Sequence, residues 1–419
     1  MNGRGNFVAA AFALTALAYG LARFAYGLLL PDIREDLSLS ATGAGWIGGS
    51  AFAAYCFGII LAFVAGARLG ERHTAVLASL MATCGLALAA VASSGWCLGL
   101  AIALGGLGTG LTSPPLAAAV ERCLDNAARP KANGAINAGT AAGIVFSGIA
   151  VMVFAGGWRA LYIVFAVIGA MVTVWLWFAT PAVARERASG ELSLKHLTRK
   201  GVWELCAGAF LMGAASTAIW TFGANIMRDD LGFADGRIAL AWIVLGSAGI
   251  FGAGTGILTV RFGIGPVHRF AVFAMVLALI GLAAASLAPM IAFAVMGLFG
   301  VAYIVSSGAF LLWGIALCPD RPDFGLGLPF LMIALGQTAG APLFGSVFDL
   351  AGSATALLSS AMVMASAAIW TESVTSIYGK GGAPQREAAS SCEASRPSGF
   401  SATPRETPSG GRHYGDRMD

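Results

Sequence analysis

Long apolar runs separated by short polar connections recur along most of the chain. Each run holds about 20 residues, which is long enough for a helix to cross roughly 30 Å of hydrocarbon. Twelve such runs predict twelve transmembrane helices. They lie near 6–30, 42–66, 74–94, 97–120, 134–155, 158–180, 203–227, 237–260, 267–287, 290–317, 325–349 and 353–372.

The composition identifies lipid as the solvent for most of the surface. Of the 419 residues 58% are hydrophobic and 11% are charged, whereas an ordinary soluble domain is roughly 25% charged. So few polar side chains cannot cover the outside of a soluble fold. The 57 glycines agree with this class, because small residues let membrane helices approach closely. We expect an all-α integral membrane protein.

Basic residues in the connections predict the orientation, because cytoplasmic loops are enriched in Lys and Arg. With the N-terminus inside, the inner connections hold fourteen basic residues before the tail and the outer ones hold four. The outer four are Arg34, Arg159, Arg228 and Arg237. We therefore expect both termini in the cytoplasm, and a location in the bacterial cytoplasmic membrane.

The connections also predict how the chain is divided. The longest polar connection, 182–201, predicts a cytoplasmic linker between an N-terminal six-helix bundle, 1–181, and a C-terminal one, 202–372. The polar segment 373–419 cannot bury a core and is expected to be disordered.

Weak internal matches relate the two halves. Segment 139–143 matches 336–340 at an offset of 197 residues, and 68–70 matches 261–263 at an offset of 193. Matches at nearly one offset, in corresponding helices, indicate a duplicated six-helix unit. Transporters with such repeats bind their substrates near the bilayer midplane, where the repeats meet.

The sequence lacks the residues that several classes of function require. The seven cysteines form no C-x-x-C pair, so neither a disulfide framework nor a metal site is indicated. The histidines are His73, His196, His268 and His413. They fall in connections or the tail, so we expect no histidine relay inside the membrane. The scattered basic residues give nucleic acid no binding surface. No H-E-x-x-H or G-x-S-x-G motif occurs, so neither an enzyme nor a cofactor is expected. Coupling to protons or another ion is left open.

The connection after the second run carries a family resemblance. Residues 68–72, Arg-Leu-Gly-Glu-Arg, resemble the second half of the G-x-x-x-D-R-x-G-x-R-R motif of the major facilitator superfamily. The resemblance covers roughly residues 6–372 and implies that family's fold of two six-helix bundles. It also implies a gating role for Arg68, Gly70, Arg72, Arg261 and Gly263. The acidic position of the motif is Ala67 in the first copy and Val260 in the second.

Two narrower resemblances point to branches of the family. The glycines of 139–148 look like a motif associated with antiporters, but its proline is absent at 144–145. The segment 23–31 is similar to the start of the YbfB-like bacterial transporters, whose substrates are mostly undefined.

Arg23 is the candidate that carries the chemistry. It is the only fully charged side chain between Arg4 and Asp32, and a charge inside a membrane helix is expensive and usually functional. On an α-helix Tyr19 and Tyr26 would share its face and flank the guanidinium. No Asp or Glu lies in the middle of a predicted span. An arriving carboxylate would therefore supply the counter-ion. The alternative is a structural arginine bonded to another helix.

Further candidates lie on helices that the resemblance implies to line a central cavity, or beside them. They are Asn137, Trp220, Asn225, Tyr303, Ser307 and Gln337. Packing between helices is the alternative for each. Pro114 and Pro115 should bend or locally unwind the fourth helix. The hydroxyls of Thr109, Thr112 and Ser113 should then bond the freed carbonyls.

These patterns predict a secondary transporter that works by alternating access as a monomer in the lipid bilayer. The expected substrate is a small organic anion that Arg23 binds in a central cavity. One alternative is an exporter of amphipathic compounds in which Arg23 is structural. A remoter one is a membrane receptor or scaffold that transports nothing.

Overall fold

The computed structural model describes residues 3–154, 156–181 and 199–371. The described helices belong to one compact unit. We call 3–181 the first half and 199–371 the second half. Most of the predicted linker, 182–201, and the predicted tail, 373–419, lie outside the described residues. The domain boundaries therefore stay predictions.

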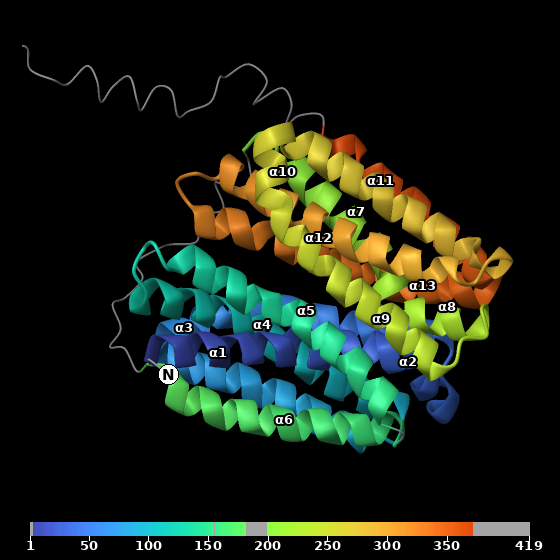
Figure 1. Ribbon diagram of the computed structural model, residues 1–419, viewed down its shortest axis with the longest axis horizontal. Helices are drawn as coiled ribbons and strands as arrows, with labels where there is room; N and C mark the ends of the chain where they lie inside the picture. The colour runs from blue at the N-terminus through green and yellow to red at the C-terminus, as the bar shows by residue number, and fades with distance from the viewer. Residues whose placement is uncertain (1–2, 155, 182–198, 372–419) are drawn as a thin grey trace, which may run out of the picture. The chain divides into compact units, whose positions relative to one another are not determined.

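The first half contains six apolar spans (Figure 1). The first is continuous from Gly3 to Leu37 and joins three helical segments. The α3 helix, Ala41–Ala90, contains two spans that meet near Gly70, whose φ is 78°. The bounds of the other elements are α1 Gly3–Thr15, η1 Ala16–Phe24, α2 Ala25–Leu37, α4 Gly95–Cys123, α5 Arg129–Val153 and α6 Gly157–Ala179.

The second half repeats this plan. Its α13 helix, Pro322–Ala367, also contains two spans, which meet at Gly352 with a φ of 84°. The earlier elements are α7 Val202–Trp220, α8 Gly223–Asp229, α9 Asp235–Gly249, η3 Ile250–Gly254, α10 Thr255–Phe262, α11 Ile264–Ala283 and α12 Ile291–Leu317. Two short 3₁₀ turns, η4 Ala285–Leu287 and η5 Ile369–Thr371, complete the described elements.

The prediction of an all-helical, multi-span membrane protein is confirmed. Eleven described segments are long and apolar enough to cross a membrane, and the last of them, Phe324–Ala367, is divided at Gly352. Positive-φ glycines turn the chain at matching places, Gly70 with Gly263 and Gly157 with Gly352. Glycine adopts this backbone conformation at little cost. Its recurrence at matching turns supports the duplication.

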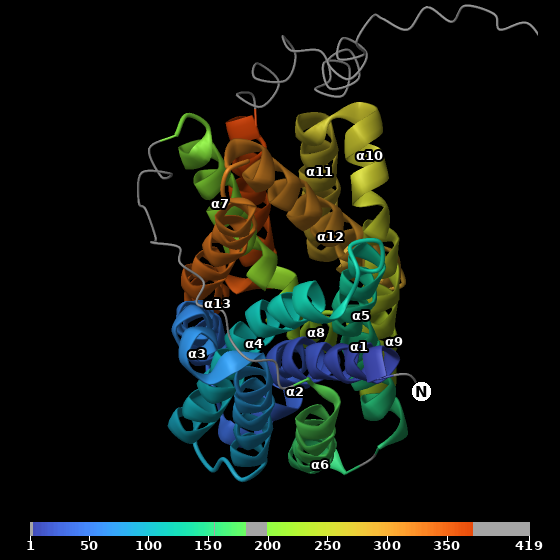
Figure 2. The same cartoon turned by 90° about the vertical axis from the view of Figure 1, so that its left-hand side faces the viewer.

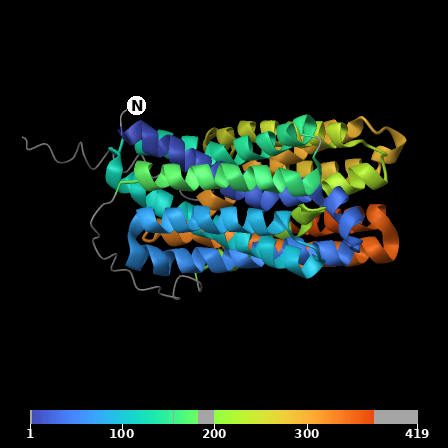
Figure 3. The same ribbon diagram turned by 90° about the horizontal axis from the view of Figure 1, so that it is seen from below.

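Successive spans run in alternate directions, so the molecule has two ends (Figures 1 and 3). The N-terminal end carries the start of α1, the end of α4 and the start of α5. The far end carries the end of α2, with α8 and the start of α9. Figure 2 looks at the helices from the N-terminal end.

The first span departs from the predicted α-helix at its centre. Residues Ala16–Phe24 form a π-helix, and the N–H of Ala25 bonds the carbonyl of Gly20, five residues earlier. Long π-helices are rare, and π-turns occur often at functional sites. The wider turn changes the register around Arg23, so the face predicted from α-helical spacing does not apply.

The α4 helix is not unwound at its two prolines. It continues through Pro114 and Pro115 to Cys123. The hydroxyls of Thr109 and Thr112 donate to the carbonyls of Gly105 and Gly108. Those carbonyls lie earlier in the helix than the ones that the prolines release, so the prediction of local unwinding with hydroxyl repair is wrong. The bend itself stays a prediction.

Glycine allows α5 to cross the π-helix closely. A methyl group added at Gly143 would lie 2.3 Å from the carbonyl oxygen of Ala16. Gly143→Ala should therefore lower the free energy of unfolding by about 1–3 kcal/mol, because a backbone atom cannot move aside cheaply. The measurement is the melting temperature of the purified protein in detergent.

Gly134→Ala is the matched control on the same helix, because a methyl group there meets nothing within 4 Å. Its melting temperature should equal or exceed that of the wild type, since alanine favours a helix over glycine. Equal melting temperatures for the two variants would contradict the crossing argument.

Candidate functional site

Arg23 lies at mid-depth in the first span, with only 8% of its surface exposed. Its Nη2 donates a hydrogen bond of 2.8 Å to Oε1 of Gln337, which lies 314 residues later in α13. This bond directly joins the two halves. The Nε of Arg23 is buried and has no hydrogen-bond partner among the described residues.

Four aromatic rings surround the guanidinium. Its Cζ lies 4.2 Å from the ring centroid of Tyr55, 4.8 Å from Phe52, 5.2 Å from Phe24 and 5.9 Å from Tyr19. A cation over an aromatic face gains about 0.5–2 kcal/mol. Placing arginine at the centre of a membrane helix costs roughly 3 kcal/mol on insertion scales. Several rings can therefore offset that cost without a carboxylate.

Gln337 is fully buried on α13 and faces both Arg23 and the second half. Its Oε1 must face Arg23, because a guanidinium only donates hydrogen bonds. Its Nε2 then lies 3.4 Å from Ser216 Oγ on α7 and 3.4 Å from Tyr303 Oη on α12. These two contacts are long for hydrogen bonds, so the amide is held weakly on the side away from Arg23.

Trp220 extends this site into an aromatic cluster. Its ring stacks on Phe24 with centroids 4.3 Å apart, and it makes an edge contact with Tyr303 at 5.2 Å. The Nε1 of Trp220 is buried without a hydrogen-bond partner in the described part of the chain. Ser307 lies one helical turn beyond Tyr303 and is 9% exposed.

The two predicted tyrosines have different surroundings. Tyr19 Oη lies 2.9 Å from Ser113 Oγ and 3.4 Å from Tyr55 Oη. Tyr26 does not flank the guanidinium as predicted, since its hydroxyl donates to the carbonyl of Ala44 at 2.9 Å. The π-helix ends at Phe24, and this change of register is the physical reason.

The two predicted asparagines lie away from the contacts of Arg23. Asn225 is on α8, where its Nδ2 donates to Asp229 Oδ2 at 2.8 Å near the far end. Asn137 is exposed on α5, two turns into that helix from the N-terminal end. Neither makes a described contact with the group around Arg23 and Gln337.

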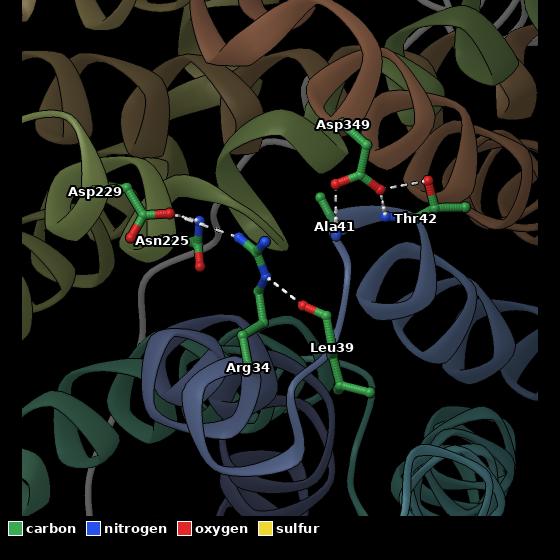
Figure 4. A network of polar contacts seen from close by, with 7 residues as sticks. All are labelled: Arg34, Leu39, Ala41, Thr42, Asn225, Asp229 and Asp349. Atoms are coloured by element: carbon green, nitrogen blue, oxygen red, sulfur yellow. Dashed lines mark hydrogen bonds and ion pairs between the residues drawn. The ribbon is translucent and has the colours of Figure 1, made fainter.

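The far end is closed by a carboxylate that joins the halves (Figure 4). Asp349 of α13 accepts hydrogen bonds from the backbone N–H groups of Ala41 and Thr42, at 2.9 and 2.7 Å. The hydroxyl of Thr42 donates to the same carboxylate at 2.7 Å. Free N–H groups at a helix start favour a negative charge. Asp349 therefore caps α3 from the opposite half.

Two arginines complete the closure beside α2 and α8. Arg34 lies 3.6 Å from the carboxylate of Asp229 and donates to the carbonyl of Leu39 at 3.2 Å (Figure 4). Arg228 of α8 pairs with Asp32 across the halves, and also with Asp235. Sequence reasoning missed the contacts between the halves, because charges at span ends are ordinary and the partners are about 200–300 residues apart.

Polar pairs at the N-terminal end join segments within one half. In the first half, Arg72 donates to the carbonyl of Thr180 at 2.6 Å. In the second half, Arg199 pairs with Asp320 at 2.6 Å, and this hydrogen bond raises the pKa of Arg199. The loop that resembles the family motif contains one carboxylate, Glu71, outside the acidic position of the motif. Glu71 is 7% exposed and pairs with Arg122 at 2.9 Å.

The other predicted gating residues lie at the same end. Gly70 and Gly263 are the positive-φ turns described above. Arg68 is exposed, and Arg261 packs over the ring of the adjacent Phe262 at 5.1 Å. Their roles in gating stay predictions.

His268 contradicts the expectation that every histidine lies in a connection or in the tail. It is fully buried in α11 rather than in a connection, and its Nδ1 lies 2.8 Å from Ser306 Oγ on α12. The helix begins at Ile264, and His268 also lies one residue inside the predicted span 267–287, so its assignment to a connection was wrong. A buried histidine therefore lies within a candidate membrane span.

Two hollows are described, and neither contains Arg23. One of about 740 Å³ lies at the N-terminal end between α1, α5 and α6. The other, of about 520 Å³, is at the far end and is bordered by Asp32, Trp158 and Arg159. A central cavity around Arg23 stays a prediction.

Comparison with known proteins identifies the family. The model of the Major Facilitator Superfamily matches residues 12–341. Human monocarboxylate transporter 11 is 24% identical over 401 residues, which cover 86% of this chain and 81% of that protein.

Two solved structures share the fold. A bacterial homologue of the human lysosomal transporter Spinster, in an inward-facing and occupied conformation, aligns with a TM-score of 0.75 and 16% identity. The alignment covers 92% of this chain and 99% of the other. The nucleoside transporter NupG aligns with a TM-score of 0.73 and 14% identity, over 91% and 100% of the two chains.

The far-end closure leads to a test of conformation. Asp349→Asn removes the charge that caps α3, and a hydrogen bond to a charged group contributes about 1.5–3 kcal/mol. The population with a separated far end should rise about tenfold or more. Spin labels at the exposed positions Val91 and Leu287, in a background without native cysteines, report this separation as a longer distance.

Asp36→Asn is the matched control, because Asp36 pairs with Arg159 at the same end but within the first half. It should leave the distance distribution unchanged. An Asp349→Asn distribution that matches the wild type would show that Asp349 does not hold the halves together.

Proposed function

The chain belongs to the major facilitator superfamily, and from that premise we propose which substrate it carries and how. The family makes it a multi-pass secondary transporter and not an enzyme. The proposed substrate is a small organic anion, a carboxylate with an apolar portion. Arg23 binds its carboxylate, and the two halves expose this site to each side of the membrane in turn.

One observation carries the proposal. The guanidinium of Arg23 is buried at mid-depth, and its hydrogen-bond partner is a neutral amide at 2.8 Å. Among the described residues no carboxylate pairs with it. Its Nε and Nη2 form one edge of the guanidinium, on which Nη2 is bonded and Nε is not. A carboxylate binds such an edge with two parallel hydrogen bonds.

Substrate binding then becomes an exchange of partners. The carboxylate takes the place of Gln337 Oε1 on Nη2 and also accepts from Nε, which pairs both donors on this edge of the guanidinium. The stacked rings of Phe24 and Trp220 beside Arg23 suit the apolar portion of the substrate. Releasing Gln337 also breaks a direct hydrogen bond between the halves.

The known relatives support the substrate class unequally. Monocarboxylate transporter 11 is named for carboxylates, and its similarity to this chain is distant. The solved structures are named for other cargo, such as nucleosides and D-xylose. The fold alone therefore leaves the substrate open, and it is the positive charge of Arg23 that favours an anion in this proposal.

The direction in which the site opens follows from the orientation. We infer that the N-terminal end is cytoplasmic, because the inner connections carry the excess of Lys and Arg. The closed far end is then external, so in this conformation the bonds at that end separate the site from the outside. Outward opening requires the bonds of Asp349, Arg34 and Arg228 to break.

An exporter of amphipathic compounds is the second candidate. The aromatic cluster favours it, because the ring of Trp220 contacts Phe24, Trp242, Phe299 and Tyr303. In that case Arg23 would be structural, tied to Gln337 in every state. The two candidates differ in how transport depends on the charge of the substrate and on Arg23.

The substrate class is tested by uptake into proteoliposomes. Wild type should take up labelled monocarboxylates and exclude neutral analogues and cationic dyes. Arg23→Ala should reduce carboxylate uptake at least tenfold, because the buried counter-charge is lost. Arg23→Lys should restore it only in part, since an ammonium cannot form the two-bond edge.

Arg237→Ala controls for loss of a positive charge, because Arg237 is exposed at the far end. Its uptake should match wild type. Carboxylate uptake by Arg23→Ala at the wild-type rate would refute the anion site. Dye transport without anion uptake would establish the exporter instead.

The exchange of partners is tested at Gln337. Gln337→Glu places a carboxylate 2.8 Å from Arg23, where it competes with the substrate. The interaction energy of a close charge pair is at least about 1.5 kcal/mol. The substrate must displace this pair, so its KM should rise about tenfold or more. Gln337→Ala removes the competitor without adding charge and should not raise KM. Equal KM values for the two variants would exclude the exchange.

A further inference from the structure

A groove runs along the first half, away from the site of Arg23. It has a volume of about 740 Å³ and lies between α1, α5 and α6 at the N-terminal end. Apolar side chains form most of its wall, among them Val8, Phe12 and Ala135. In Figure 1, α1 runs between α5 and α6 on the side towards the viewer.

The length of the groove matches one leaflet of a bilayer. Its wall on α1 extends from Arg4 to Ala13, and nine steps of 1.5 Å give about 14 Å. Half of a hydrocarbon core of about 30 Å is about 15 Å. An acyl chain that begins at the membrane surface would therefore fill the groove along its length.

The mouth of the groove is positively charged. Arg4 and Lys131 border it, and no acidic side chain lines it. Lys131 is exposed and makes no hydrogen bond or ion pair with any residue that the structure describes. Arg4 pairs with Asp125 at 2.8 Å, with both side chains more than 60% exposed. Such a surface pair is weak, so Arg4 can exchange Asp125 for a stronger anion.

A tryptophan indicates where the mouth of the groove lies in the membrane. Trp175 of α6 borders the groove, and its Nε1 donates to Asn6 Oδ1 at 3.0 Å. Tryptophan gathers where hydrocarbon meets headgroups. Arg4 and Lys131 are therefore at headgroup level, and the apolar wall is at acyl-chain level.

We propose that this groove binds one anionic phospholipid of the leaflet at the N-terminal end. Its phosphate lies between Arg4 and Lys131, and one acyl chain lies against Val8, Phe12 and Ala135. Basic pockets between transmembrane helices are a general means of recognising anionic lipids. The site is separate from Arg23, so it does not depend on the proposed substrate.

Native mass spectrometry of the detergent-purified protein tests the site with two lipids of equal chain length. Phosphatidylglycerol should bind about tenfold more tightly than phosphatidylcholine, because two cations meet its net charge. Arg4→Gln with Lys131→Gln should abolish this preference. Ala135→Trp, which fills the groove at an exposed position, should weaken binding of both lipids.

Lys200→Gln is the matched control, because Lys200 is an exposed lysine at the same end but outside the groove. It should keep the preference for phosphatidylglycerol. Equal binding of the two lipids to wild type would overturn the proposal, as would equal losses in the control and the double variant. Inorganic phosphate that displaces the lipid at millimolar concentration would also overturn it, since the acyl chain would then contribute nothing.

Discussion

A positive charge in the centre of an apolar slab must be neutralised or surrounded by compensating dipoles. Arg23 meets this constraint with aromatic faces and one amide oxygen, since no described carboxylate pairs with it. These contacts stabilise the cation and still allow it to bind an anion. An anion attracts an arginine more strongly than aromatic rings and amides do. Much of the centre is arranged around it, from the π-helix to the pairing of α13 with the first half.

The two ends of the molecule differ in how the halves meet. At the far end, capping, ion pairs and glycine contacts act together. Near this end, a methyl group on Gly45 would lie 2.4 Å from the carbonyl oxygen of Ala341. Closer to the centre, one on Gly27 would lie 1.9 Å from that of Trp220. Such close approach brings α2 against α7 and α3 against α13. At the N-terminal end, the described ion pairs stay within each half. Separation there costs fewer polar contacts than separation at the far end.

The sequence alone predicted the spans and a charged Arg23 inside the first of them, because length and hydrophobicity decide insertion and a charge within an apolar run is conspicuous. It also indicated Gln337 and Tyr303, but not that the amide oxygen of Gln337 would meet Arg23. Tyr26 was misplaced because α-helical spacing does not hold beyond a π-helix. Asp349 and His268 were missed because each lies near an expected span end, where polar residues carry little information. Their partners, Thr42 and Ser306, become visible only in three dimensions.

The distance along the chain between Arg23 and Gln337 matters for biogenesis. The amide arrives 314 residues after the arginine, which at 5–20 residues per second is about 15–60 s of synthesis. Phe24 is adjacent to Arg23, while Phe52 and Tyr55 follow in the next span. The first helical hairpin can therefore shelter the charge soon after it enters the bilayer. The remaining spans can then be synthesised while aromatic rings already surround the guanidinium of Arg23.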